Sequence, residues 1–266
     1  MRNYLEVAVE AAKLGGDVLK QYYQQNKGIR YKGEIDIVTD ADKRSERLIV
    51  DLLSARFPKH SILAEEGTDM SQPSEFKWVI DPLDGTTNFA HDYPFFCVSV
   101  ALERNGEVMV GVVYHPIFEE LFVAEKHGGA YLNGRRIEVS KVDRLRNALL
   151  STGFPYDVLD DPGDALRHFE SFIHTAQAVR RDGSAALDLC YLAMGRFDGF
   201  WELRLKPWDT AAGTLMVTEA GGQVTDFRRE TYSIYQDEIL ASNGLIHDQM
   251  RAAMDRSQPT PAPQFS

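Results

Sequence analysis

Two carboxylates flank a proline in the segment Asp81-Pro82-Leu83-Asp84-Gly85-Thr86-Thr87-Asn88. Mg²⁺ binds an octahedron of hard oxygen ligands, usually a few carboxylates, a substrate phosphate and water. Because Pro82 restricts the backbone, a sharp bend there would bring Asp81 and Asp84 to the same pair of ions. The same bend would turn the Leu83 carbonyl inward as a further oxygen ligand. The segment therefore predicts a magnesium site.

The residues after Asp84 suit a phosphate ester. Gly85 permits a close approach of the backbone, so its amide and that of Thr86 can face a phosphate oxygen. The Thr86 hydroxyl can then orient a water molecule. This order of residues has little purpose in a plain turn, and we interpret it as the metal and phosphate end of a site.

Two further acidic groups lie upstream, at Asp40 with Asp42 and at Glu65 with Glu66. Each group opens a predicted helix or ends a predicted strand, where ligands gather in α/β proteins. Each also has a purely structural explanation, because Asp40 or Asp42 could cap a helix. Glu65 and Glu66 could equally lie in an exposed loop.

The elements that must position these groups follow from the spacing of apolar residues. In the first half of the chain, helical spacing predicts helices at residues 4–22 and 41–56, the second with Thr39 or Asp40 as its N-cap. Short apolar runs that end in carboxylates predict strands at 61–64 and 77–80. Alternating residues and two Asn-Gly turns, at 105–106 and 133–134, predict antiparallel strands between residues 96 and 139.

Strands and helices alternate again in the second half. The predicted strands lie near residues 149–150, 197–203, 224 and 239, and the predicted helices at 163–178, 184–194, 209–220 and 247–254. We expect an N-terminal lobe of residues 1–145 that carries the metal-binding motif, and a C-terminal lobe of residues 146–256 that completes the site. The Pro-rich composition of residues 257–266 predicts a disordered tail.

Composition excludes several classes of function. A net charge of −11 over 266 residues argues against a nucleic-acid surface, which needs clustered Lys and Arg. The sequence contains neither an apolar run of about 18 residues, which a membrane span requires, nor a signal-peptide core. Cys97 and Cys190 lie in apolar stretches and are expected to be buried free thiols. The sequence therefore predicts a cytoplasmic protein that reaches an anionic substrate through divalent cations.

Two separate motifs resemble those of the inositol monophosphatase family. Residues 81–88 resemble its first signature, and Lys206-Pro207-Trp208-Asp209-Thr210-Ala211-Ala212-Gly213 with Glu219-Ala220-Gly221-Gly222 resembles its second. Residues 39–42 and 64–66 match its upstream acidic elements. The spacing agrees from about residue 4 to about residue 250.

The resemblance implies a layered αβαβα sandwich of the α/β (α+β) class, as found in sugar phosphatases. It also implies a homodimer that uses two to three Mg²⁺ ions and is inhibited by lithium. The metal ligands implied are Glu65, Asp81, the Leu83 carbonyl, Asp84 and Asp209. Thr86, with Asp42 behind it and Glu65 nearby, would polarise the water that attacks phosphorus. Asp40 is one position away from the family's catalytic acid, so we assign it to capping.

The resemblance also implies a set of substrate contacts, comprising Asp84, Gly85, Thr86, Gly183, Ser184, Ala185, Glu202 and Asp209. Ser184 could instead be an ordinary helix cap. Glu202 lies where inositol monophosphatases place a carboxylate that accepts hydrogen bonds from ring hydroxyls, which favours a polyol substrate. The loop that begins at Gly153 departs from animal enzymes, which leaves the width of the substrate open.

The function expected is hydrolysis of myo-inositol 1-phosphate to myo-inositol and phosphate by metal-activated water. Paired metals can activate water and neutralise the leaving alkoxide, so no side-chain nucleophile is needed. The sequence contains neither a G-x-S-x-G nor a Cys-x5-Arg motif. The alternatives are a fructose-1,6-bisphosphatase, alone or as a second activity, and a phosphatase-like dimer with an additional regulatory binding role.

Overall fold

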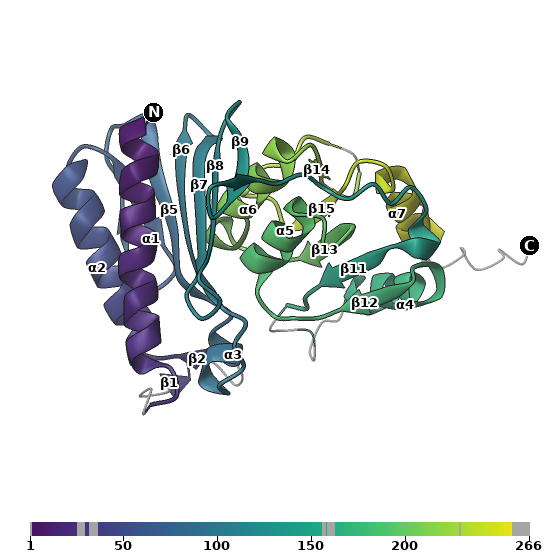
Figure 1. The fold of residues 1–266 in the computed structure, drawn as a ribbon, viewed down its shortest axis with the longest axis horizontal. Coiled ribbons are helices and arrows are strands. Elements are labelled where there is room, and N and C mark those ends of the chain that lie inside the picture. Colours follow the sequence, from purple (N-terminus) through teal and green to yellow (C-terminus); the bar gives the residue numbers. More distant parts are fainter. Residues whose placement is uncertain are drawn as a thin grey trace, which may run out of the picture.

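Layers of helix and sheet alternate through the protein in the computed structural model, which describes residues 2–25, 30–31, 37–155, 158, 163–228 and 230–256. The first layer consists of helices α1 (Arg2–Tyr22) and α2 (Asp40–Arg56), which lie side by side against one face of a large sheet (Figure 1). Both helices present apolar residues to that face, including Val7, Ala11, Leu19, Ile49 and Leu53. This burial, rather than helix propensity alone, fixes both helices on the sheet.

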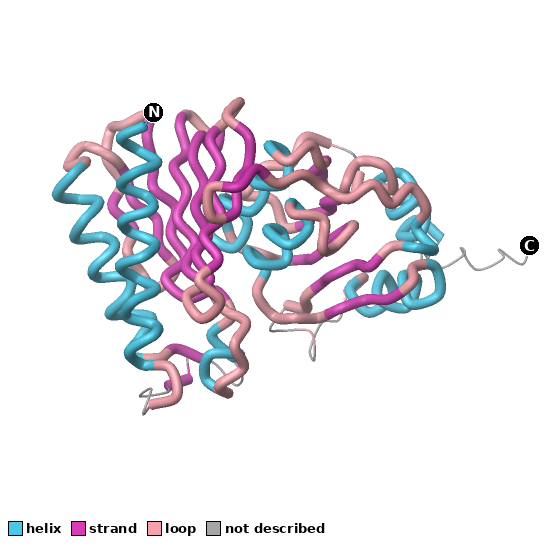
Figure 2. Tube along the Cα trace, viewed as in Figure 1, coloured by secondary structure: helices cyan, strands magenta, loops and turns pink. Residues whose placement is uncertain are grey.

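The large sheet has the strand order β10-β9-β8-β7-β6-β5-β3-β4 and is antiparallel except for the pair β3 and β5 (Figure 2). Its strands are β3 (Ser61–Ala64), β4 (Asp69–Met70), β5 (Phe76–Asp84), β6 (Cys97–Arg104), β7 (Glu107–His115), β8 (Glu120–Glu125), β9 (Gly129–Leu132) and β10 (Arg135–Arg136). Both predicted Asn-Gly turns join neighbouring strands, with Asn105 at φ 51° and Gly106 at φ 86°. These left-handed angles match the twist of an antiparallel hairpin.

Helices α5 (Ala185–Ala193) and α6 (Pro207–Glu219) form the middle layer, between the large sheet and a second sheet (Figure 1). Small residues allow α6 to lie close to the large sheet. A Cβ atom on Gly111 of β7 would lie 3.0 Å from the backbone of Ala212. This close approach holds the N-terminus of α6 beside the end of β5.

The second sheet has the order β12-β11-β13-β15-β14. Its strands are β11 (Leu149–Thr152), β12 (Ala178–Arg180), β13 (Gly199–Leu203), β14 (Gln223–Thr225) and β15 (Glu238–Ser242). The outermost layer on this side consists of α4 (Ala165–Thr175) and α7 (His247–Arg256), and a short 3-10 helix, Leu145–Asn147, precedes β11. The predicted αβαβα sandwich is confirmed.

Most of the predicted elements are present, and the differences are local. The helix predicted over 163–178 ends at Thr175, because Ala178–Arg180 pairs in parallel with β11 as strand β12. The helix predicted from 209 begins at Pro207, which occupies its first turn. Helix α3 (Thr86–Ala90) and the strand pair β1 (Arg30–Tyr31) and β2 (Ile37–Val38) were not predicted.

Further expectations from the sequence concern the cysteines, membrane spans and the division into lobes. Cys97 and Cys190 are buried free thiols, as expected. None of the described helices is both long and apolar enough to cross a membrane. The division into lobes at residue 145 stays a prediction, and the predicted tail, 257–266, lies outside the described residues.

Candidate active site

A β-bulge in strand β5 places Asp81 and Asp84 on the same side of the large sheet. Asp81 pairs with Ser99 and Asp84 pairs with Cys97, so three steps along β5 match two steps along β6. In a regular strand, residues three apart point to opposite faces, and one extra residue restores the same face. The bend predicted at Pro82 is therefore this bulge, and it turns both carboxylates toward α5 and α6.

Asp84 is held at the N-terminus of α5. Its Oδ2 accepts hydrogen bonds from the Ser184 hydroxyl at 2.6 Å and the Ala186 amide at 2.8 Å. Burial raises the pKa of Asp84 to about 6, although these bonds act to lower it. Ser184 is also the N-cap of α5, where its oxygen accepts from the Leu187 amide at 3.4 Å. Ser184 is thus a helix cap that also holds Asp84, and its contact with a substrate stays a prediction.

Asp209 approaches the same place from the first turn of α6. Its Oδ2 accepts a hydrogen bond of 2.6 Å from the Lys206 amide, which fixes the carboxylate at the start of the helix. Burial, and then the charge of Asp84, raise the pKa of Asp209 to about 7. The pKa of Asp81 is raised well above its ordinary value by burial, and then by the charges of Glu65, Asp84 and Asp209. These four carboxylates, from three separate parts of the chain, therefore repel one another across a small space.

The Thr86 hydroxyl lies between a backbone carbonyl and a buried acid. Its Oγ1 is 3.0 Å from the Leu83 carbonyl oxygen and 3.3 Å from Oδ1 of Asp42. Asp42 is buried in α2, and burial raises its pKa to about 6. Thr39 donates to Asp42 from both its amide and its hydroxyl. The structure therefore places Asp42 behind Thr86, as the resemblance implied.

The assignment of Asp40 to capping is wrong. Thr39 is the N-cap of α2, and its hydroxyl oxygen accepts from the amides of Ala41 and Asp42 at 3.2 and 3.4 Å. Asp40 is the first residue of the helix itself. The reciprocal bond from Asp42 to the Thr39 amide completes a capping box, so the cap and the acid behind Thr86 are one structure.

The chemistry of the donor set fits Mg²⁺. Every candidate ligand is an oxygen, from Glu65, Asp81, Asp84 and Asp209 and from the Leu83 carbonyl. Within the described ranges, no group of three or more Asp, Glu, His or Cys side chains is arranged so that it could hold a metal ion by itself. Mg²⁺ does not need such a group, because it is usually held by one or two carboxylates together with substrate phosphate and water. A divalent cation would also offset the repulsion that raises the pKa of Asp81 and Asp209.

Two adjoining cavities collect the predicted residues. The larger, about 480 Å³, is lined by eight of them: Glu65, Asp81, Leu83, Asp84, Gly85, Thr86, Glu202 and Asp209. The smaller, about 110 Å³, adds Gly183, Ser184 and Ala185 and shares Asp84 and Glu202 with the larger. Of the predicted site residues, only Asp42 lines neither cavity. The structure thus brings the two motifs to one place.

Glu202 of β13 lines both cavities. Burial, and then the charges of Asp209 and Asp84, raise the pKa of Glu202, while the charge of Arg181 lowers it. Gly153 lies directly against this carboxylate, and a Cβ atom there would be 2.2 Å from Oε1 of Glu202. The glycine at the start of this unusual loop is therefore required by the position of Glu202.

Asn88 explains the last position of the first motif. Its side-chain amide donates to the carbonyls of Phe95 at 2.8 Å and Asp182 at 2.7 Å. A third contact reaches the Gly183 carbonyl at 3.4 Å. Gly183 has φ 85°, a conformation that disfavours other residues. Asn88 thereby fixes the turn that leads into α5, where Ser184 and Ala186 donate hydrogen bonds to Asp84.

Gly153 and Phe154 belong to the loop in which the sequence prediction left the width of the substrate open, and Lys206 belongs to the second motif. Three charged cavity residues were given no role by the prediction: Arg181, Asp188 and Arg204. Asp188 follows Ser184 by four residues, so the two share one side of α5. That spacing could have identified it. The others lie in irregular segments, where no periodicity marks a residue as facing a site.

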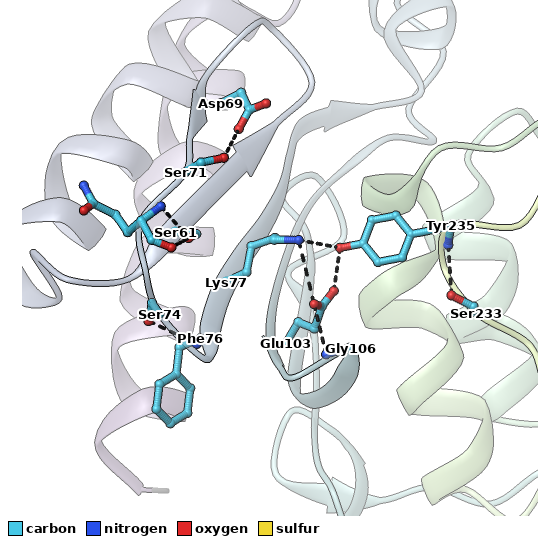
Figure 3. A network of polar contacts seen from close by, with 11 residues as sticks. Ser61, Asp69, Ser71, Ser74, Phe76, Lys77, Glu103, Gly106, Ser233 and Tyr235 are labelled. Atoms are coloured by element: carbon cyan, nitrogen blue, oxygen red, sulfur yellow. Dashed lines mark hydrogen bonds and ion pairs between the residues drawn. The ribbon is translucent and has the colours of Figure 1, made fainter.

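A loop before β15 braces the site from outside. Lys77 of β5 donates to the Tyr235 hydroxyl at 2.9 Å, and this hydroxyl donates to the buried Glu103 of β6 at 2.6 Å (Figure 3). In the same loop, the Tyr232 hydroxyl donates to Thr210 at 3.1 Å, one residue after Asp209. The loop therefore ties the start of α6 to the sheet that carries Asp81.

Comparison with known proteins agrees with this geometry. The sequence profile of the Inositol monophosphatase family matches residues 1–258. The inositol-1-monophosphatase of Synechocystis sp. is 43% identical over 256 residues, covering 96% of this chain and 89% of that protein. The solved structure of inositol monophosphatase from Anabaena (Nostoc) sp. superposes with a TM-score of 0.89 at 44% identity and covers 98% of both chains. The Nus factor SuhB of Vibrio cholerae is 42% identical, covering 91% of this chain and 92% of that protein.

The chain belongs to the inositol monophosphatase family. It is accordingly a phosphoric monoester hydrolase, from a family that is metal-dependent. The resemblance identified from residues 81–88 and 206–222 is confirmed.

Proposed function

We propose that this enzyme hydrolyses myo-inositol 1-phosphate to myo-inositol and phosphate, with Mg²⁺ as its cofactor. The observation that carries the proposal is the arrangement of Asp84 and Glu202. Asp84 and Asp209, with Asp81, mark a phosphate and metal group of carboxylates, and Glu202 lines both cavities together with Asp84 and Asp209. A buried carboxylate is an acceptor of hydrogen bonds only, and vicinal hydroxyls are its natural donors.

Glu65, Asp81, Asp84, Asp209 and the Leu83 carbonyl would hold the metal. When bound, Mg²⁺ activates water and stabilises the negative charge that develops on phosphate and on the leaving oxygen. Mg²⁺ also gives an acidic cavity the positive charge that a phosphate ester requires. The carboxylates of the chain thus act as an anion site only in combination with cations.

Thr86 and Asp42 provide a path for a proton. When the Thr86 hydroxyl donates to Oδ1 of Asp42, its oxygen can accept a hydrogen from the attacking water. The pKa of Asp42, raised to about 6, brings this acid close to neutral pH and suits it to receiving a proton. The bond to the Leu83 carbonyl is the alternative use of the same hydrogen, so it is released when the hydroxyl donates to Asp42. We assign Thr86 the role of orienting the attacking water, with Asp42 and Glu65 assisting.

The test is release of phosphate from a panel of esters, with and without Mg²⁺ and Li⁺. The panel contains myo-inositol 1-phosphate, fructose 1,6-bisphosphate and 2-glycerophosphate. We expect Mg²⁺-dependent release that is fastest, as kcat/KM, for the inositol ester and is inhibited by Li⁺. Release that is independent of Mg²⁺, or absent with every ester, would refute the proposal.

Fructose 1,6-bisphosphate is the second candidate because of two cationic residues. Arg204 and Lys206 line the larger cavity, beyond the carboxylates that surround Asp84. A second phosphate could lie against them while the first occupies the metal end. A kcat/KM for the bisphosphate that equals or exceeds that for the inositol ester would favour this alternative.

Two further features belong to the same proposal. We expect a homodimer in solution, as the resemblance implies, and a cytoplasmic location, as the composition predicts. Sedimentation of the purified protein tests the first. The name of the Vibrio cholerae relative is that of a Nus factor, so a regulatory binding role beside catalysis remains an alternative for this chain.

A further inference from the structure

The smaller cavity has one acidic residue with no role in the function proposed above. Asp188 lies in the first turn of α5, four residues after Ser184, and contributes to the cavity wall together with Glu202. Its side chain is 1% exposed. Within the described part of the chain, Oδ1 of Asp188 has no hydrogen-bond partner.

An unpartnered carboxylate oxygen is costly in a protein interior. Burial, and then the charges of Asp182, Glu202 and Asp84, raise the pKa of Asp188, and only Arg181 opposes them. Arg181 is exposed and lines the same small cavity. Buried acids kept without a partner are more often found at binding sites than in purely structural positions, because a ligand can supply the missing donor.

We propose that Asp188 is a second hydroxyl acceptor beside Glu202, and that the pair selects a neutral polyol with at least two hydroxyl groups at this end. The inference rests on the proposed function and makes it more specific. Two carboxylates accept hydrogen bonds from hydroxyls and repel a phosphate dianion. The wall that Asp188 and Glu202 form therefore disfavours a second phosphate, which the larger cavity could hold beside Arg204 and Lys206.

The two ends of the site then differ in the charge that they accept. At the metal end, cations reverse the charge of the carboxylates. At the Asp188 end, within the lining of the smaller cavity, Arg181 is the one Lys or Arg side chain. Selection of a polyol at this end thus depends on Asp188 and Glu202, which lie outside both family motifs.

The variants Asp188→Asn and Asp188→Ala test this role on the Mg²⁺-loaded enzyme. The amide removes the charge and keeps the shape, and alanine removes the acceptor without adding a donor. We expect kcat/KM for myo-inositol 1-phosphate to fall by about 10- to 100-fold, mainly through KM. The value for 2-glycerophosphate, which lacks the inositol ring and its further hydroxyls, should change less than about twofold. With Asp188→Asn, the ratio of bisphosphate to inositol phosphate hydrolysis should rise.

Asp182→Asn is the matched control, because it removes a neighbouring acidic charge from a residue outside the cavity lining. It should change each kcat/KM by less than about threefold. An equal loss for all three esters in the Asp188 variants, or no change in their ratios, would overturn the inference while the proposed function stands. A wild-type enzyme inactive on the whole panel would refute the proposed function, and this inference with it.

Discussion

Replacing Gly153 by alanine should separate the polyol end of the site from the phosphate end. A Cβ atom at this position would lie 2.2 Å from Oε1, 2.4 Å from Cδ and 2.5 Å from Oε2 of Glu202. All three atoms belong to the carboxylate, so the clash falls on the group assigned to bind hydroxyls. The three atoms nearest to the added methyl group are all from Glu202.

The size of the effect follows from these distances. An ordinary contact begins at 3.4 Å, so Cδ at 2.4 Å must move by about 1 Å. A misplacement of about 1 Å can reduce a rate by about 100-fold. Loss of a hydrogen bond to a charged acceptor, about 1.5–3 kcal/mol, corresponds to a reduction of about 10- to 100-fold. We therefore expect kcat/KM for myo-inositol 1-phosphate to fall by about 10- to 100-fold in Gly153→Ala.

The assay compares this ester with 2-glycerophosphate, which does not extend to Glu202. Hydrolysis of 2-glycerophosphate should change less than about threefold, and the melting temperature should show that the fold persists. The decisive control is a double-mutant cycle with Glu202→Ala, which removes the clashing group. In that background, Gly153→Ala should have almost no further effect. A full additional loss would show that the glycine acts on something other than Glu202, and the reasoning would be refuted.

Three other perturbations test separate parts of the structure. Asp209→Asn should reduce Mg²⁺-dependent turnover by more than about 100-fold and preserve the melting temperature, since the amide fills the same space; near-wild-type rates across a Mg²⁺ titration would refute the metal assignment. Tyr235→Phe should lower the free energy of unfolding by about 1–2 kcal/mol, because it removes the hydroxyl bonds to Lys77 and Glu103. Urea denaturation measures this change. An unchanged denaturation midpoint would show that these bonds do not stabilise the fold. Burial lowers the pKa of His115 from 6.5 to about 4, so the folded state binds fewer protons than the unfolded state between these pH values. The free energy of unfolding should therefore decrease as pH falls through this window, and His115 should account for about 2 kcal/mol of the decrease at pH 5. His115→Leu should remove that contribution. His174→Leu, on the exposed side of α4, is the control and should leave the pH dependence of stability unchanged.

Local patterns in the sequence predicted much of the fold. The Asn-Gly turns specify hairpins by their own backbone preferences, and the helical spacing of apolar residues located α1 and α2. Strand β12 could not be predicted in this way, because three residues carry no usable period. It exists only because Ala178–Arg180 can pair with β11, which is a tertiary effect.

The site was predicted in composition but not in geometry. Ligand preferences of Mg²⁺ identified Asp81 and Asp84 from the residue types alone. The bulge that turns both toward one face depends on pairing with Ser99 and Cys97, which the sequence does not reveal. The contact between Gly153 and Glu202 joins strands β11 and β13 and is likewise invisible before folding.

Asp84 is the residue through which the two halves of the chain depend on each other. It ends β5 in the large sheet, yet its Oδ2 accepts its two short bonds from Ser184 and Ala186 at the start of α5, beside a longer one of 3.8 Å from the Cys97 thiol. The turn before α5 is fixed in return by Asn88, which belongs to the same motif as Asp84. Each half therefore holds the other's contribution in place, so a substitution on either side of this junction disturbs both the metal end and the polyol end. That mutual dependence explains why a motif of eight residues carries both the carboxylates and an asparagine with no direct part in the chemistry.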